Sequence, residues 1–251
     1  MPLVKGFDAS AVQGAIPFWL VSKELRFCIL KAQSGNDGFD PSFARNVKEA
    51  LAEGLEPFAY QFAYPLPGCT PGRDPREQAK LFVDRTLAVS RVMEGRPFFL
   101  DYEWPSPDQW PRWGCSASQI ADWCAANAEE VENLTAVTPF IYTYPHWWAA
   151  VAKGGDVSWA VHYPLWIASY PTATGWPKED DLPVVPKPWT TWGMWQFDGN
   201  KGLKLPNGVD ADFCVFNGSE ADLLTLAGKP PPKPHGNDVL GEAASCTVDR
   251  K

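Results

Sequence analysis

The chain has 251 residues, of which 45% are hydrophobic and 21% are charged, and its formal net charge is −8 at pH 7. A chain of this length and composition can bury one large core as a single globular domain. The negative charge argues against nucleic acid and anionic membrane surfaces as partners, because both attract basic patches.

The sequence carries no sign of export or of a membrane span. In the first twenty residues the apolar stretches are broken by Lys5, Asp8, Gln13 and Pro17, which is not the plan of a signal peptide. No run of about 18 apolar residues is present. The six cysteines and three histidines show no spacing typical of a metal site. We therefore expect synthesis in the cytoplasm, reduced thiols, no membrane insertion, no metal and no cofactor.

Short apolar runs alternate with amphipathic helices over the first 143 residues. Strands are predicted at residues 4–7, 27–30, 57–62, 98–103 and 140–143. Helices are predicted to begin at Asp40-Pro41, at Asp74-Pro75 and at Ser118, where a capping residue or a proline precedes helical spacing of apolar residues.

Helical patterning weakens in the last third of the chain. Strands are predicted at residues 165–169, 194–197 and 209–213, and a short last helix at 219–226. Strand–helix alternation predicts a parallel sheet, and eight such strands predict a barrel. We expect one α/β barrel domain over residues 1–228, followed by a Pro-rich flexible tail over 229–251.

The most informative stretch is Phe-Phe-Leu-Asp-Tyr-Glu at residues 98–103, which ends an apolar run with two carboxylates. Asp101 and Glu103 are two residues apart, so in a strand they share one face about 6.5–7 Å apart. Like charges this close push their pKa values apart, as the cleavage of a glycosidic bond requires. The alternative from these six residues alone is a solvated strand end beside a turn.

Other strand ends also carry acids. Asp8 follows the first predicted strand and Asp210 lies in the last. In a parallel barrel the reactive residues lie at the carboxyl ends of the strands, because the βα loops meet there. Acids from three separate strand ends, on Asp8, Asp101, Glu103 and Asp210, therefore predict one catalytic rim.

With these acids in place, the sequence resembles glycoside hydrolase family 25, the lysozymes (muramidases) common among phage endolysins. The resemblance covers about residues 4–226 and rests on an ordered series of short motifs: Gly6-Phe7-Asp8-Ala9-Ser10, Leu30-Lys31-Ala32, Phe43-Ala44-Arg45-Asn46, Ala59-Tyr60-Gln61-Phe62, Asp101-Tyr102-Glu103, Ile141-Tyr142-Thr143, Leu165-Trp166-Ile167-Ala168, Trp195-Gln196-Phe197 and Val209-Asp210.

The resemblance implies a modified TIM-like barrel with eight strands and about five helices, (β/α)5(β)3, that cleaves the β-1,4 bond between N-acetylmuramic acid and N-acetylglucosamine in peptidoglycan. It implies that Glu103 is the general acid, that Asp101 assists through the 2-acetamido group, and that Asp8 and Asp210 support them. Retention or inversion of configuration stays open. The positions implied to bind the sugar are Tyr60, Gln61, Tyr142, Trp166, Tyr170 and Gln196.

Two features depart from the family pattern. Gln61 stands where the family often has His, and the segment around Asp210 and Asp212 is longer than usual. Asp210 is preferred over Asp212 as the fourth carboxylate. Trp104, Trp110 and Trp113 could form a groove wall or a loop core, whereas Trp147 and Trp148 are expected in the core.

Two other functions remain open. One is a non-catalytic glycan-binding barrel, and the other is a chitinase-like glycosidase, although that pattern needs an acid at position 99, where this chain has Phe99. The expected partner is cell-wall peptidoglycan, bound by a monomer. The expected setting is a phage endolysin released to the wall, or a bacterial protein exported by a non-classical route.

Overall fold

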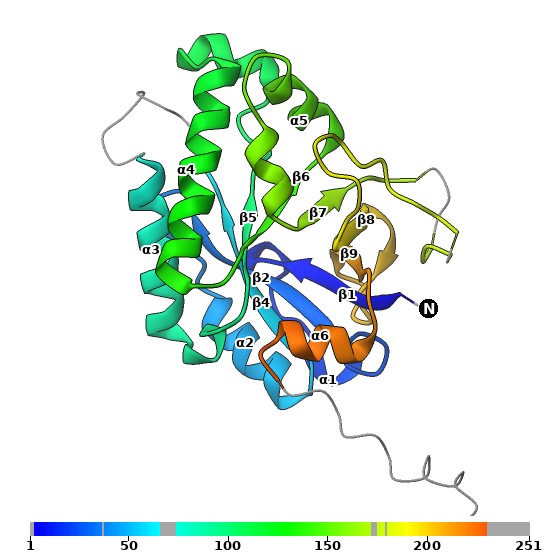
Figure 1. The fold of residues 1–251 in the computed structure, drawn as a ribbon. Helices are drawn as coiled ribbons and strands as arrows, with labels where there is room; N and C mark the ends of the chain where they lie inside the picture. The colour runs from blue at the N-terminus through cyan, green and yellow to red at the C-terminus, as the bar shows by residue number, and fades with distance from the viewer. Residues whose placement is uncertain (1–2, 37, 66–73, 172–174, 179, 230–251) are drawn as a thin grey trace, which may run out of the picture.

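The computed structural model describes residues 3–36, 38–65, 74–171, 175–178 and 180–229 (Figure 1). The strands are β1 (Val4–Ala9), β2 (Phe27–Ser34), β3 (Gly38–Phe39), β4 (Glu56–Phe62), β5 (Phe98–Asp101), β6 (Phe140–Thr143), β7 (Leu165–Ala168), β8 (Met194–Lys204) and β9 (Asp210–Phe216). The helices are α1 (Phe18–Val21), α2 (Phe43–Ala52), α3 (Pro75–Val89), α4 (Ala117–Thr135), α5 (Pro145–Ala152) and α6 (Glu220–Leu226). Short 3-10 segments are η1 (Ala11–Gln13), η2 (Arg91–Met93), η3 (Pro107–Trp113) and η4 (Ser158–His162).

The strands close into a barrel through β1, which confirms the predicted eight-stranded fold. The strand order is β1-β9-β8-β7-β6-β5-β4-β2, and β1 also pairs with β2; the two-residue β3 is an extra strand beside β2. In the barrel, β1 pairs in parallel with β2, and the neighbours β2, β4, β5, β6, β7 and β8 also pair in parallel. Strand β9 runs antiparallel to both β8 and β1. The start of β9 therefore lies at the same end of the barrel as the carboxyl ends of the other strands.

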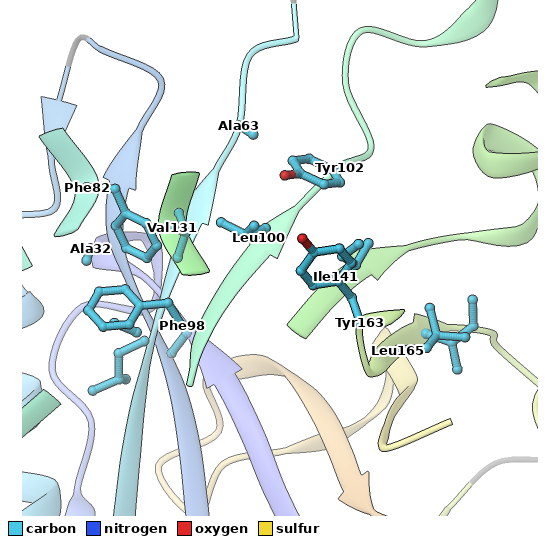
Figure 2. Close-up of a cluster of buried hydrophobic side chains, with 14 of the residues drawn as sticks. Ala32, Ala63, Phe82, Phe98, Leu100, Tyr102, Val131, Ile141, Tyr163 and Leu165 are labelled. Atoms are coloured by element: carbon cyan, nitrogen blue, oxygen red, sulfur yellow. The ribbon is translucent and has the colours of Figure 1, made fainter. Parts of the chain in front are cut away.

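Alternation along the strands divides the apolar side chains into two cores. One set packs against the surrounding helices, as Figure 2 shows for Leu100, Ile141 and Leu165 of successive strands, with Phe82 from α3 and Val131 from α4. The other set fills the barrel interior. The members of this interior cluster include Phe27, Ile29, Phe58, Phe99, Phe140, Met194 and Phe216. Strands that are buried on both faces explain the continuous apolar runs in the sequence.

Helix starts lie close to the predicted capping residues, with two corrections to the sequence-based prediction. The helix predicted from Asp40-Pro41 begins at Phe43, with Ser42 at its N-cap position. Asp74 caps α3 as predicted, and its carboxylate accepts from the backbone N–H groups of Arg76 and Glu77 at 2.8 and 3.1 Å. The helix predicted from Ser118 begins at Ala117 instead. Ser116 caps it, because Ser116 and Gln119 exchange side-chain to backbone hydrogen bonds at both ends of a capping box.

Helix α6 closes the end of the barrel opposite the carboxyl ends of the parallel strands. Its Leu223, together with Ala227 just beyond it, belongs to the interior cluster. Lys229, which the sequence assigned to the flexible tail, forms an ion pair with Glu56 at the start of β4. Residues 230–251 of that predicted tail lie outside the described residues. In the described part of the chain, no helix is both long and apolar enough to cross a membrane.

A buried ion pair ties the start of β4 to the segment before β5. Arg96 donates to Glu56 at 3.1 Å and to the carbonyl oxygen of Pro57 at 2.9 Å, and both charged side chains are at most 5% exposed. Removing one partner of a buried pair leaves the other charge without compensation.

We expect Arg96→Met to lower the free energy of unfolding by about 3–5 kcal/mol, because Glu56 stays buried and, among the described residues, keeps Lys229 as its one ion-pair partner. Urea denaturation followed by circular dichroism measures this loss. Arg91→Met is the matched control, since the Arg91–Glu94 pair is 73% and 61% exposed and should contribute about 1 kcal/mol or less. Equal losses in the two variants would contradict the importance of the buried pair.

Candidate active site

The carboxyl ends of the parallel strands form one mouth of the barrel. At this mouth the side chains that face inward are polar. Successive side chains of a strand alternate between its two faces, so residues two positions beyond an interior apolar residue also face inward. The residues that this alternation places there are Asp8 (β1), Lys31 (β2), Tyr60 (β4), Asp101 (β5), Tyr142 (β6), Gln196 (β8) and Asp212 (β9). Glu103 follows two residues after Asp101, and Tyr170 two residues after β7.

Asp8 is one of the two buried acids at this mouth. It is 6% exposed, and its Oδ2 accepts from Gln196 Nε2 at 2.7 Å and from the Cys214 thiol at 3.4 Å. Burial raises the pKa of Asp8 well above its usual value, and the negative charges of Asp212 and Glu103 raise it further. The two hydrogen bonds oppose this rise but do not cancel it.

Asp101 and Glu103 share a raised pKa but differ in access to solvent. Asp101 is 6% exposed, whereas Glu103 is only half-buried. Burial is the main cause for both; the charge of Glu103 adds to the rise for Asp101, and the charge of Asp212 adds to it for Glu103. Among the described residues, Oδ1 of Asp101 has no hydrogen-bond partner. This oxygen is a buried acceptor directed to the side of the strand that carries the other acids.

The fourth acid at the mouth is Asp212, not the predicted Asp210. Asp212 pairs in register with Asp8 across β1 and β9, and burial followed by the charge of Asp198 raises its pKa to about 6. Asp210 is the first residue of β9, two residues before Asp212, and its exposed carboxylate pairs with Lys204 at 2.8 Å. Both acids face the same side of β9, but Asp210 lies beyond the last residue paired with β1.

Gln196 connects Asp8 to two tyrosines. Its Nε2 donates to Asp8, while its Oε1 accepts from the hydroxyl of Tyr142 at 2.9 Å and from the hydroxyl of Tyr170 at 2.7 Å. Gln196 is 3% exposed and Tyr142 is 5% exposed, so the hydrogen bond between these two residues is buried. Of the predicted sugar-binding residues, Gln196 is therefore engaged with protein groups through both its amide nitrogen and its oxygen.

Lys31 is a site residue that sequence reasoning missed. Its ammonium lies 4.8 Å from the ring centroid of Phe62 and 5.8 Å from that of Tyr60. Its positive charge lowers the pKa values of both Asp101 and Glu103, against the larger effect of burial. The signal was present in the sequence, because a lysine at the end of an apolar strand, two residues after Ile29, faces inward whenever Ile29 does.

Two predicted sugar-binding aromatics offer little surface, and a third offers much more. Tyr60 is 8% exposed and Trp166 is 2% exposed, and the ring centroid of Trp166 lies 6.1 Å from that of Tyr60 and 4.4 Å from that of Tyr142. Tyr170 is 43% exposed and lies at the mouth. We infer that Trp166 supports the tyrosines from within the barrel.

The placement of Gln61 is at odds with the prediction that it binds substrate. It lies next to the inward-facing Tyr60, so its side chain points to the other face of β4. There Gln61 is fully buried, and its Nε2 donates to the backbone oxygen of Gln78 on α3 at 3.3 Å. Gln61 thus contributes to the packing of helix α3 on the barrel.

The tryptophans of the loop after β5 divide between core and surface. Trp110 is 7% exposed, and its Nε1 donates to the oxygen of Pro105 at 2.9 Å, so it belongs to the loop core. Trp104 and Trp113 form an edge-to-face pair at 6.0 Å, and Trp113 is 39% exposed. Trp147 and Trp148 are at most 1% exposed, as expected for core residues.

The donor set of this site does not resemble a metal site. Within the described residues, no group of three or more His, Cys, Asp or Glu side chains is arranged to hold a metal ion. Asp8 accepts hydrogen bonds from an amide and a thiol, and the charge of Lys31 acts on Asp101 and Glu103.

Comparisons with known proteins identify the family and the fold of this chain. Residues 7–204 match the family described as glycosyl hydrolases family 25. The bacterial lysozyme from Streptomyces coelicolor is 27% identical, with a TM-score of 0.70 over 90% of this chain and 98% of that chain. The catalytic domain of endolysin ply40 from bacteriophage P40 of Listeria monocytogenes shares the fold, with 19% identity and a TM-score of 0.68 over 91% and 98%.

A curated relative is also similar over most of its length. The uncharacterized protein YegX of Escherichia coli O157:H7 is 27% identical over 226 residues, which are 88% of this chain and 72% of the relative. The family match extends over most of the barrel and includes Asp8, Asp101 and Glu103. The chain therefore belongs to family 25 of the glycosyl hydrolases, and it is a glycoside hydrolase.

Proposed function

We propose that this enzyme hydrolyses peptidoglycan at the β-1,4 bond between N-acetylmuramic acid and N-acetylglucosamine. The observation that carries the proposal is the set of four acids, Asp8, Asp101, Glu103 and Asp212, at one mouth of the barrel, with all four pKa values raised. Glycosidic bond cleavage needs one carboxyl group that keeps its proton near neutral pH and a second that acts as a carboxylate.

Glu103 is assigned the role of general acid. Burial and the charge of Asp212 favour its protonated form, and its partial exposure leaves the carboxyl group accessible to a substrate at the mouth. In the reaction, Glu103 transfers its proton to the glycosidic oxygen as the bond from that oxygen to the anomeric carbon breaks.

Asp101 is assigned the role of orienting the 2-acetamido group. Its buried Oδ1 has no partner among the described residues, and an amide N–H of the substrate would satisfy it. The acetamido oxygen is then directed toward the anomeric carbon, and the negative charge of Asp101 stabilises the positive charge that develops on the acetamido group. The charge of Asp8 acts on Asp101, and the charge of Asp212 acts on Glu103. Asp8 is held in place by the hydrogen bond that it accepts from Gln196.

The substrate class is supported by the similarity to a bacterial lysozyme and to the catalytic domain of a phage endolysin. We propose that the enzyme acts as a monomer on the bacterial cell wall, after release from an infected host cell or after non-classical export. The chitinase-like alternative lacks the acid that its pattern requires at Phe99, and a purely binding barrel has no need for four neighbouring acids with raised pKa values.

We expect Glu103→Gln to lower the rate of wall hydrolysis by about 10²–10⁴-fold, because the amide cannot deliver a proton. Mass spectrometry of the muropeptides after digestion measures the products, and the new reducing-end sugar from the wild type should be N-acetylmuramic acid. An unchanged thermal unfolding curve is the control for folding. Turnover like that of the wild type in this variant, or a new N-acetylglucosamine end, would refute the assignment.

We expect Asp101→Asn to reduce kcat by about 10²-fold while affinity for insoluble peptidoglycan changes less than about tenfold. The asparagine keeps an acceptor oxygen but loses the charge that stabilises the reacting acetamido group. Initial rates and co-sedimentation with purified cell walls measure the two quantities separately. Parallel losses of rate and affinity would point to a structural role for Asp101.

We expect Asp212→Asn to lower activity at pH 7 by about tenfold or more, whereas Asp210→Asn changes it by about twofold or less. The charge of Asp212 raises the pKa of Glu103, so removing it lowers that pKa and the protonated fraction at neutral pH. The alkaline limb of the pH–rate profile should therefore move to lower pH in Asp212→Asn alone. A larger effect at Asp210 would restore the sequence-based choice.

A further inference from the structure

A row of aromatic side chains leads out of the mouth along the inner face of β4. Tyr60, Phe62 and Tyr64 are spaced two residues apart, as residues that share one face of a strand are. The ring centroids of Phe62 and Tyr64 lie 5.6 Å apart, so Tyr64 continues the row just beyond the end of the strand. Tyr60 is 8% exposed, whereas Phe62 and Tyr64 are half-buried. Because Phe62 pairs in register with Asp101, the row starts beside the acids and runs toward solvent.

The loop after β5 extends this row. Trp104 directly follows Glu103 in the chain, and its ring centroid lies 5.0 Å from that of Tyr64. Trp113 in η3 lies 6.0 Å from Trp104, again between ring centroids, and is 39% exposed. Rings from two neighbouring connections of the barrel therefore form one continuous aromatic surface that begins next to Glu103.

Two fully buried glutamines hold the backbone around the Tyr64 ring. Gln78 on α3 binds both backbone groups of Tyr64: its Oε1 accepts from the N–H at 3.2 Å, and its Nε2 donates to the carbonyl oxygen at 3.1 Å. Gln33 on β2 donates through Nε2 to the carbonyl oxygen of Gly35 at 2.8 Å. The N–H of Gly35 in turn donates to the carbonyl oxygen of Phe62 at 2.9 Å.

The Tyr64 ring packs directly on the backbone of Gly35, which has a φ of +47°. A Cβ atom at this position would lie 2.2 Å from Cδ2 of the ring, so any side chain here would displace Tyr64. The ring is thus fixed from below by a glycine and from behind by buried hydrogen bonds. Such pre-organisation lowers the entropy cost of binding a ligand, and it keeps a binding residue in its productive geometry.

The chemistry of this surface fits an uncharged sugar ring. A contiguous apolar patch beside a reactive site is typical of a ligand-binding surface. The C–H faces of a pyranose pack on aromatic rings while its hydroxyl groups stay in water. The net charge of −8 and the acids at the same mouth disfavour an anionic occupant. Of the two sugars in a peptidoglycan chain, N-acetylglucosamine is the one that carries neither a lactyl group nor a peptide.

We propose that Tyr64 and Trp104, extended outward by Trp113, form a platform that binds an N-acetylglucosamine ring of the glycan chain cleaved at the acids. Gln33 and Gln78 are positioning residues, because they act on the sugar only through the placement of Tyr64. The inference rests on the proposed function and deepens it, since it adds a contact for the polymer outside the reacting groups.

Titration with the β-1,4-linked tetramer of N-acetylglucosamine tests the platform. Two-dimensional ¹H–¹⁵N NMR of the tryptophan indole N–H groups follows binding and yields Kd. Trp104→Ala and Tyr64→Ala should each raise Kd by about tenfold, because each removes one ring contact with the sugar. Trp113→Ala, at the outer end, should raise Kd by less. No binding by the wild type, or an unchanged Kd in both Trp104→Ala and Tyr64→Ala, overturns the proposal.

Conservative variants separate the ring contact from loosened packing. Tyr64→Phe keeps the ring and the backbone hydrogen bonds, so its Kd should stay within about twofold of the wild type. Gln78→Met removes both hydrogen bonds to Tyr64, and Gly35→Ala displaces its ring, so both should raise Kd about as much as Tyr64→Ala does. An equal loss in Tyr64→Phe and Tyr64→Ala, or an unchanged Kd in Gln78→Met and Gly35→Ala, overturns the platform as described.

Trp19→Ala is the matched control. Trp19 is 59% exposed, its ring centroid lies 5.3 Å from the ammonium of Lys23, and it belongs to α1 in the connection between β1 and β2. We expect this variant to keep the Kd of the wild type. A loss as large as that of Trp104→Ala would mean that exposed tryptophans bind the sugar without a built site, and would overturn the platform.

Binding and hydrolysis fail separately, because the titration requires no cleavage. If the wild type releases no muropeptides from cell walls, the proposed function fails, and the Kd of Trp104→Ala against that of the wild type still decides the platform. If the wild type releases muropeptides and both alanine variants bind the tetramer as tightly as it does, the platform fails and the proposed function stands.

Discussion

The site depends on the closure of the barrel through β1. This strand pairs in parallel with β2 on one side and antiparallel with β9 on the other, so segments from the two ends of the chain meet at one strand. The pairing sets Asp8 opposite Asp212 and beside the strand that carries Lys31. A shift of one residue in either register would turn these side chains toward the helices. The hydrogen-bond ladder of β1 thus fixes which charges face one another in the interior.

Concentrating acids in the interior has a cost for the folded state. A carboxyl group whose pKa is raised on folding favours the fold below its unfolded pKa, and this contribution is lost as the pH rises through the folded value. For Asp212 the interval runs from 3.8 to about 6. The apolar cores, which include the fully buried Phe99 and Trp195, and the Arg96–Glu56 pair supply the stability that offsets this cost. The arrangement is typical of active sites, where the raised pKa values that serve catalysis lower the stability of the folded state.

Most of the fold could be predicted from the local sequence pattern. Some residues of the site could be identified only from the register in which the strands pair. The eight strands follow from apolar runs, and Asp101 with Glu103 follows from one strand end. Asp210 and Asp212 share a face of β9, so only the pairing with β1 distinguishes them. The outward placement of Gln61 could have been predicted, because an inward Tyr60 turns its neighbour to the other face of the strand. The four-residue α1 has too little periodicity to be recognised, and the amide network of Gln196 joins residues up to 188 positions apart in sequence.

The reversed direction of β9 has a further consequence for the shape of the mouth. Every parallel strand contributes the loop that follows it, but β9 contributes the turn that precedes it, residues 205–209, which joins it to the long β8. Asn207 in this turn donates to the oxygen of Ala15 in the loop after β1, at 3.1 Å. The β8–β9 hairpin is therefore braced at its tip, and its length sets how far one wall rises above the acids. A longer or shorter hairpin would change the height of this wall while the pairing of β1 with β2 and β9 stays in place.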